Sequence, residues 1–142
     1  MEETELKQKI LDVLKGSHLA SLATIKDDRP WVRYVMTHGT DDLTLYVNTF
    51  VQSRKVAQIK ADPNVHVILG ADPNDMEHAY LNIAAAAEVL DDAETKKRFW
   101  SDQLKAYFSG PDDPNLVVLK ITPSVIELMS PGKMQPDIYR AE

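Results

Sequence analysis

Apolar positions at the start of the chain recur with helical spacing and then change to the spacing of strands. Four apolar residues between Leu6 and Leu14 fall on one face of an amphipathic helix predicted over residues 3–15. The segments that follow are short, rich in β-branched and aromatic residues and separated by the turn-like sequences KDDR and HGTDD. They predict an antiparallel meander with strands over residues 18–25, 30–36 and 43–49.

A second helix and two further strands are predicted in the middle of the chain. Ser53 has the character of an N-cap, whose hydroxyl accepts a free backbone N–H, and the helical pattern after it ends at Asp62 and Pro63. Residues 65–70 read as a strand. Residues 79–92 contain four successive alanines, which favour a helix, but both ends of the segment favour a strand, and we interpret it as a strand.

The last third of the chain predicts one helix and two strands. Residues 94–108 place five large apolar side chains on one helical face, a pattern typical of core packing: Phe99, Trp100, Leu104, Tyr107 and Phe108. Two closing strands are expected to bend at Pro123. Six or seven short strands with few helices predict a mainly β fold, a small closed antiparallel barrel with peripheral α-helices.

Length and composition limit the classes of protein that this sequence can belong to. A chain of 142 residues fits a single domain over residues 1–142. Its hydrophobic fraction of 44% includes no apolar run near the roughly 20 residues that cross a bilayer. The acidic, polar N-terminus does not resemble a signal peptide, and a chain without cysteine suits a reducing compartment. We therefore expect a cytoplasmic protein without a membrane association.

Charge and motifs exclude several chemistries. A net charge of −6 is the wrong sign for a protein whose affinity comes from nucleic-acid phosphates. The five glycines form neither a dinucleotide fingerprint nor a phosphate-binding P-loop, and no serine lies in a nucleophile elbow. The four histidines lack metal-ligand spacing, so no metal site is expected.

Two cations occupy the N-terminal turn of the predicted second helix, where positive charge is unfavourable. Arg54 and Lys55 follow Ser53 directly, at the positive end of the helix macrodipole, where each charge costs roughly 0.3–1 kcal/mol. Free N–H groups together with two cations favour a phosphate at this point. The alternative is that both side chains pair with surface carboxylates such as Asp41 or Asp62.

Arg33 is a candidate third member of this group. It lies within the apolar segment PWVRYVM, on the strand before the one that leads into the Ser53 helix. Because antiparallel neighbours are joined by short turns, this strand and the helix entry are expected to lie side by side, with three cations around one phosphate. The alternative is a strand residue that faces solvent.

The order of four segments resembles a known family. RPWVRYVM, LYVN, SRKVAQIKADPNV and IAAAAEVLDD together are similar to the FMN-binding split-barrel family related to pyridoxamine 5'-phosphate oxidase, most closely its general-stress-protein-26-like branch. The resemblance runs from about Leu19 to about Glu127. It implies a six- to seven-stranded antiparallel split β-barrel, FMN as cofactor, and a homodimer with the flavin at the interface.

The resemblance also implies roles for ten residues. Arg54 and Lys55, beside Ser53, would contact the FMN phosphate, and Arg33 would lie near the phosphate and ribityl chain. Two strand segments would face the flavin: Tyr34, Val35 and Met36 on the second strand, and Val47, Asn48 and Thr49 at the end of the third.

The sequence departs from true oxidases near its end. Leu128 and Met129 replace the aromatic residue and tryptophan that follow Glu127 in their last strand. The arginine-rich segment that holds pyridoxal phosphate is replaced by SPGKMQPDIYRAE over residues 130–142. The resemblance therefore implies a flavin-dependent oxidoreductase acting with a small-molecule substrate or electron donor, but not vitamin B6 oxidation.

Three other functions stay open from the sequence. One is a module that binds or senses flavin without turnover. Another is a related barrel that holds a deazaflavin or haem, for which His38 or His66 would be the histidine to examine. The last is a dimeric scaffold without a cofactor.

Overall fold

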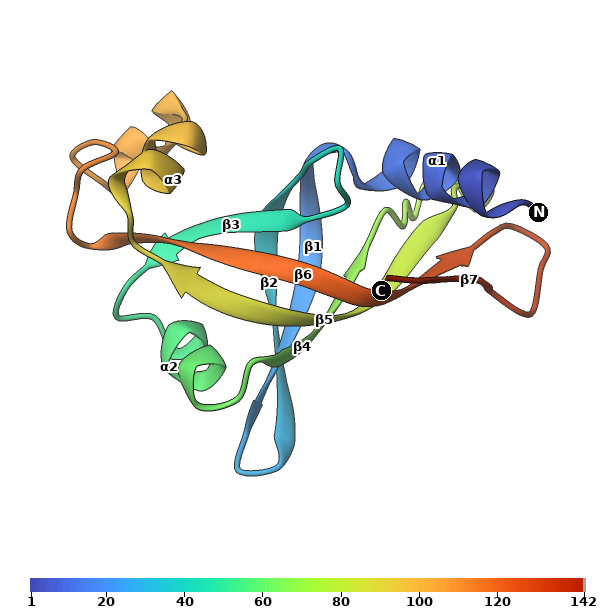
Figure 1. The fold of residues 1–142 in the computed structure, drawn as a ribbon, viewed down its shortest axis with the longest axis horizontal. Coiled ribbons are helices and arrows are strands. Elements are labelled where there is room, and N and C mark those ends of the chain that lie inside the picture. Colours follow the sequence, from blue (N-terminus) through green and yellow to red (C-terminus); the bar gives the residue numbers. More distant parts are fainter. Residues whose placement is uncertain (142) are drawn as a thin grey trace.

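The computed structural model describes residues 1–141, and its centre is a closed barrel of six antiparallel strands (Figure 1). The strands lie in the order β3-β2-β1-β4-β5-β6, and β3 pairs with β6 to close the barrel. A seventh strand, β7, extends the sheet beyond β6. The strands are β1 (Gly16–Lys26), β2 (Arg29–Gly39), β3 (Leu45–Phe50), β4 (Asn64–Leu69), β5 (Tyr80–Leu90), β6 (Leu116–Met129) and β7 (Asp137–Arg140).

Side chains that alternate along the strands fill the barrel. On β4, Val65, Val67 and Leu69 are buried while the residues between them are exposed, the period-two pattern of a sheet with one face against the core. The longest hairpin pairs β1 with β2 over their whole lengths. Its two-residue turn consists of Asp27 and Asp28, both with positive φ, the conformation that matches the twist of paired strands.

Helices cover the barrel from three sides (Figure 1). Helix α1 (Glu3–Leu14) buries three apolar residues against the sheet. Helix α2 (Arg54–Ala61) packs on β1 and β5. Helix α3 (Ala93–Arg98) and the 3-10 helix η1 (Asp102–Ala106) lie together at the end of the barrel where β5 leaves and β6 begins.

The prediction of one continuous helix over residues 94–108 is wrong. Helix α3 ends at Arg98, and Ser101 is extended before η1 begins. Ser101 and Asp102 are residue types that favour starting a helix over continuing one, which explains the break. As a result, Phe108 is buried but Tyr107 is 68% exposed, and the five apolar residues do not share one face in the core.

The two closing strands form one long strand with an irregularity. β6 runs through Pro123, and its pairing with β5 shifts register between Ala84 and Ala85. A proline lacks the N–H that a ladder needs, and a bulge accommodates that gap. Residues 137–140 of the C-terminal segment form β7, which the sequence pattern did not predict.

This architecture confirms the predicted mainly β barrel with peripheral helices. In residues 1–141 none of the helices has the length and apolar character that a membrane crossing requires.

Candidate functional site

Three cations converge where the barrel meets the first turn of α2. Arg33 comes from β2, and Arg54 and Lys55 are the first two residues of α2. Arg54 is close enough to Arg33 to lower its pKa, and Arg33 does the same to Lys55. The structure thus brings together the three residues that the sequence predicted as neighbours.

Arg33 is fixed in place by oxygen atoms of the barrel and of α2. Its Nη1 donates to the main-chain oxygens of Leu22 at 3.2 Å and Trp31 at 3.0 Å and to Thr24 Oγ1 at 2.7 Å, while Nη2 donates to Gln58 Oε1 at 3.0 Å. Thr24 also donates to Gln58, which closes the network. Arg33 is therefore half-buried and turned toward α2, and it is not a solvent-facing strand residue.

No carboxylate neutralises this cluster within residues 1–141. Among residues 1–141, no ion pair within 4.0 Å involves Arg33, Arg54 or Lys55. The two carboxylates proposed as partners have other roles, because Asp41 pairs with Lys15 at 2.9 Å and Asp62 accepts from the main-chain and side-chain amides of Asn64. The surface-pairing alternative is not what the structure shows.

The cost of this arrangement appears in the pKa values of two groups. Burial lowers the pKa of Arg33 and that of Lys55, and the neighbouring cation lowers each further. An anion bound between them would favour the charged forms and reverse both effects. The cluster is therefore electrostatically suited to an anionic group.

Ser53 occupies the N-cap position of α2 without capping it. Its side chain makes no hydrogen bond to the first turn, and its Oγ instead lies 3.4 Å from Thr49 Oγ1. The predicted hydroxyl cap is thus wrong, because the serine turns toward the end of β3. The first-turn N–H groups consequently lack a side-chain acceptor, which suits an anion-binding helix start.

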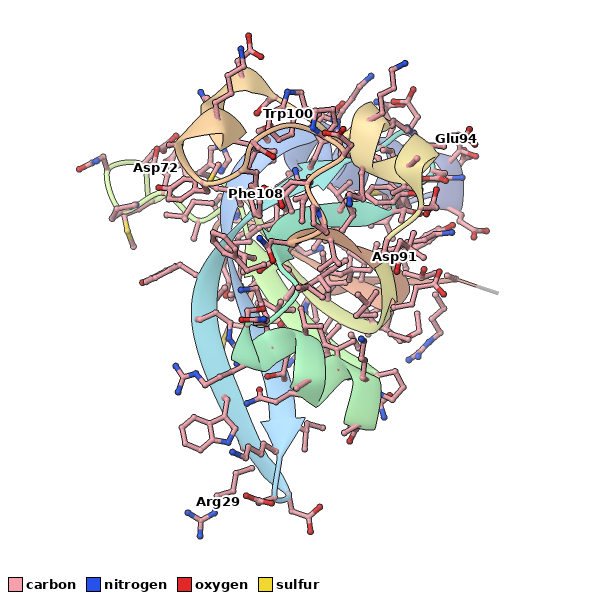
Figure 2. The ribbon with its side chains drawn as sticks, turned by 90° about the vertical axis from the view of Figure 1, so that its left-hand side faces the viewer. Arg29, Asp72, Asp91, Glu94, Trp100 and Phe108 are labelled. Atoms are coloured by element: carbon pink, nitrogen blue, oxygen red, sulfur yellow. The ribbon has the colours of Figure 1, made fainter. Side chains whose placement is uncertain are left out.

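A cavity of about 690 Å³ lies between the barrel strands β2 and β3 and the segment that follows α3. One wall comes from β2 and β3 and includes Met36, Asn48 and Thr49. The other comes from residues 98–108, which we call the cap; Figure 2 shows Trp100 and Phe108 in this region, above the barrel. Aromatic rings line both sides: Tyr46, Phe50, Phe99, Trp100, Tyr107 and Phe108.

The six strand residues predicted to face the flavin divide into three groups. Met36, Asn48 and Thr49 line the cavity. Val35 and Val47 point into the core and are 7% and 3% exposed, so any ligand contact they make is through the backbone. Tyr34 is 75% exposed on the outer face of the barrel and does not line the cavity.

Asn48 has one amide atom that lacks a partner within the described residues. Its Nδ2 donates to the main-chain oxygen of Phe99 at 3.0 Å, which ties the barrel to the cap. Its Oδ1 is buried and accepts no hydrogen bond. Because an unpaired buried acceptor is costly, the cavity wall offers an unmet acceptor to a ligand N–H or O–H.

Buried polar contacts join the segments on either side of the cap to each other and to the end of β3. Lys96, only 6% exposed, donates through Nζ to the main-chain oxygen of Asp113 at 2.8 Å. The Asp113 carboxylate accepts from the N–H groups of Ser109 and Asn115, both at 2.9 Å, and these hydrogen bonds lower its pKa. The main-chain oxygen of Asn115 accepts from Val51 N–H at 2.8 Å. The two segments that flank the cap are thereby held together.

Sequence reasoning missed two parts of this site. Gln58 interrupts the apolar stripe of α2 as a polar residue only 9% exposed, a signal that a buried partner such as Arg33 was required. The aromatic residues of the cap follow a helical spacing that predicts core packing, so their place on the cavity wall was not predicted.

One of the two histidines considered as haem ligands lies at the site. His38 lines the cavity. His66 does not line it, and its Nε2 forms a hydrogen bond of 2.5 Å with Asn82 Oδ1. No cluster of potential metal ligands occurs within residues 1–141.

A closed six-stranded barrel with this helix entry is a split barrel. The chain belongs to the pyridoxamine 5'-phosphate oxidase family, whose model matches residues 6–130. It is 42% identical over 136 residues to general stress protein 26 of Bacillus subtilis (strain 168), an alignment covering 96% of each chain. These matches confirm the family and branch that the sequence motifs indicated.

Solved structures agree with this assignment. General stress protein 26 of Bacillus anthracis str. Sterne superimposes with a TM-score of 0.83 at 33% identity, covering 96% of this chain and 99% of that one. A Clostridium acetobutylicum protein related to general stress protein 26 gives a TM-score of 0.76 at 18% identity, covering 99% and 96%. The second likeness shows the fold alone.

Proposed function

We propose that the protein binds FMN and uses it as an oxidoreductase of a small molecule. The observation that carries this proposal is the cluster of Arg33, Arg54 and Lys55, which has no ion-pair partner within residues 1–141. Ser53, directly before the cluster, contacts Thr49 on the wall of the aromatic-lined cavity. FMN has a matching form, a phosphate at one end and a flat ring system at the other. Family membership supports the same assignment.

The residues present fit this cofactor at both ends. Arg54, Lys55 and the first-turn N–H groups of α2 would hold the phosphate, with Arg33 locked beside them by Thr24 and Gln58. Met36, Asn48 and Thr49 would contact the flavin, and the unpaired Asn48 Oδ1 would accept a hydrogen bond from it. The hydrogen bond between Thr49 and Ser53 joins the two ends.

Bound FMN supplies hydride and electron transfer, and the protein supplies position and electrostatics. Here the cations neutralise the phosphate and the aromatic walls exclude water from the cavity. His38 also lines the cavity, and its imidazole would offer a ligand a hydrogen bond there. The exchange of the oxidase's last-strand aromatic residues for Leu128 and Met129 argues against pyridoxamine phosphate as substrate.

A second copy of the chain fits the outer face of β1, β2 and β4. Five large apolar side chains on this face are exposed, and they lie at neighbouring positions of the three paired strands. They are Leu19, Val32, Tyr34, Met36 and Ile68, which we call the outer patch. Met36 belongs to both the patch and the cavity wall. We propose a homodimer through this patch, with the flavin site near the interface.

The first test is the absorption spectrum of purified protein before and after adding FMN and desalting. Retained flavin bands in the near-ultraviolet and blue support the proposal. A retained deazaflavin or haem would replace FMN with one of the alternative cofactors. No retained chromophore after saturation with FMN would overturn the flavoprotein assignment.

A further inference from the structure

We propose that the cavity under the cap takes a planar aromatic carboxylic acid, whose carboxylate pairs with Arg98. This inference deepens the proposed function, because it names the class of small molecule that would meet the flavin. It rests on the shape, the lining and the charge of the cavity described above.

The cavity has two walls with different residues. The wall that includes Met36, Asn48 and Thr49 continues through Ser53 to the cationic start of α2. The cap, which includes Arg98, forms the other wall. If FMN lies against the first wall, the cap is the wall that faces a substrate.

Arg98 is the one formally charged side chain among the described residues that line this cavity. Its Cζ lies 4.7 Å from the ring centre of Phe99 and 5.6 Å from that of Tyr46, so the guanidinium rests on aromatic surface. No ion pair within 4.0 Å involves it in residues 1–141. Its planar donor groups therefore remain available, and they match the two oxygens of a carboxylate.

Two carboxylates that share a neighbouring cavity with Arg98 are already engaged. Asp41 and Asp42 line a neighbouring cavity that Arg98 also borders. Asp41 pairs with Lys15 at 2.9 Å, and Asp42 accepts from Thr40 Oγ1 at 2.5 Å. An exogenous anion would thus meet little competition for Arg98.

Aromatic rings on both walls favour a flat ligand. Phe99 stacks on Tyr46 with ring centres 4.0 Å apart and planes inclined by 22°. Phe50 meets Phe108 at 4.5 Å and Tyr107 edge-on at 6.3 Å. Because Phe99 and Tyr46 already stack on each other, a ligand ring does not insert between them. A flat ring that lies beside these pairs buries area against their remaining surfaces, which a puckered ring of equal size fits less well.

The test compares three probes of similar size: benzoate, benzamide and cyclohexanecarboxylate. The chain has two tryptophans, and Trp100 lines the cavity, so a Trp31→Phe background makes Trp100 fluorescence the reporter of binding. We expect benzoate to bind on the order of tenfold more tightly than benzamide, the scale of one charge-assisted contact. Cyclohexanecarboxylate should bind more weakly than benzoate.

Arg98→Gln should remove the preference for benzoate over benzamide, and Arg98→Lys should retain part of it. Lys97→Gln is the matched control, since it removes one exposed cation next to Arg98 in the same helix and outside the cavity lining. Equal affinities for benzoate and benzamide, or a preference that survives Arg98→Gln, would overturn the inference.

Titrations with and without bound FMN separate this inference from the proposed function. Benzoate binding to the FMN-loaded protein without loss of flavin supports both. Benzoate preference in a protein that retains no FMN keeps the aromatic-acid site and overturns the flavoprotein proposal. Stoichiometric displacement of FMN by benzoate would overturn the second site while the flavin assignment stands.

Discussion

The start of α2 and the cavity under the cap are linked through Ser53 and Thr49, yet they are built in opposite ways. The first combines the adjacent residues Arg54 and Lys55 with Arg33 of β2, which comes one strand earlier in the chain. The second is assembled from β2, β3 and residues 98–108, which are distant in sequence. The first is charged, with Arg33 fixed by hydrogen bonds, and the second is aromatic with one guanidinium.

This difference determines what each region contributes to recognition. A desolvated cation cluster stabilises an anion strongly but selects little beyond charge. An aromatic cavity selects shape, and its single guanidinium selects one feature of the ligand. Changes at the first region should therefore affect cofactor retention most.

The largest expected effect follows from removing both cations at the start of α2. Arg54→Ala combined with Lys55→Ala eliminates two charge-assisted contacts at about 1.5–3 kcal/mol each, so FMN affinity should fall at least about a hundredfold. Equilibrium dialysis measures this loss. The control Lys7→Ala with Lys60→Ala removes the same charge from exposed helix positions and should leave affinity unchanged. Wild-type affinity in the first variant would contradict the phosphate site.

The next effect concerns the outer patch. Val32→Glu combined with Tyr34→Glu places two carboxylates among apolar side chains that are 65% and 75% exposed in the single chain. If a second copy covers them, burying these charges is prohibitive and the protein should sediment as a monomer. Met134→Glu, at an apolar residue 93% exposed outside the patch, is the control and should sediment as wild type. A monomeric wild type would contradict the dimer.

The sequence predicted the first region and the barrel but not the second region. Arg54 and Lys55 were visible because they violate a local rule, and the barrel followed from strand periodicity and turns. The structure of the cap could not be predicted, because Ser101 interrupts the continuous helix that the spacing of Phe99 to Phe108 predicts. The position of the cap depends on the contacts of Phe99 with Tyr46 and Asn48, and no local pattern encodes those tertiary contacts.

A smaller effect is expected from loosening the cap. Asp113→Ala removes the acceptor for Ser109 and Asn115, so hydrogen exchange over the cap should accelerate while the barrel strands stay protected. The same contacts lower the pKa of Asp113 below 3.8, so their contribution is complete above that pH and is lost as pH falls through the lowered value. Asp112→Ala, at its exposed neighbour, is the control. Unchanged exchange in Asp113→Ala would show that the carboxylate does not fasten the cap.

The smallest expected effect has opposite signs in the free and the bound protein. Lys55→Gln removes a cation disfavoured at a helix start by about 0.3–1 kcal/mol, which should raise the Tm of the ligand-free protein by roughly 1–4 °C. The same change should reduce the increase in Tm that FMN binding produces, because a phosphate contact is lost.

The pH dependence of that stability identifies the cause. The pKa of Lys55 is lowered from 10.5 in the folded chain. Between the folded and the unfolded pKa, the unfolded chain therefore binds more protons than the folded chain. Lys55 thus makes the free energy of unfolding of the wild type increase as pH rises through this window. Lys55→Gln should lack that gain, whereas Lys60→Gln, at the far end of α2, should keep it. Thermal melts of the three proteins across the alkaline range measure the difference. Parallel profiles would mean that Lys55 is not strained by its neighbours, and the case for a built anion site would then rest on Arg33 and Arg54.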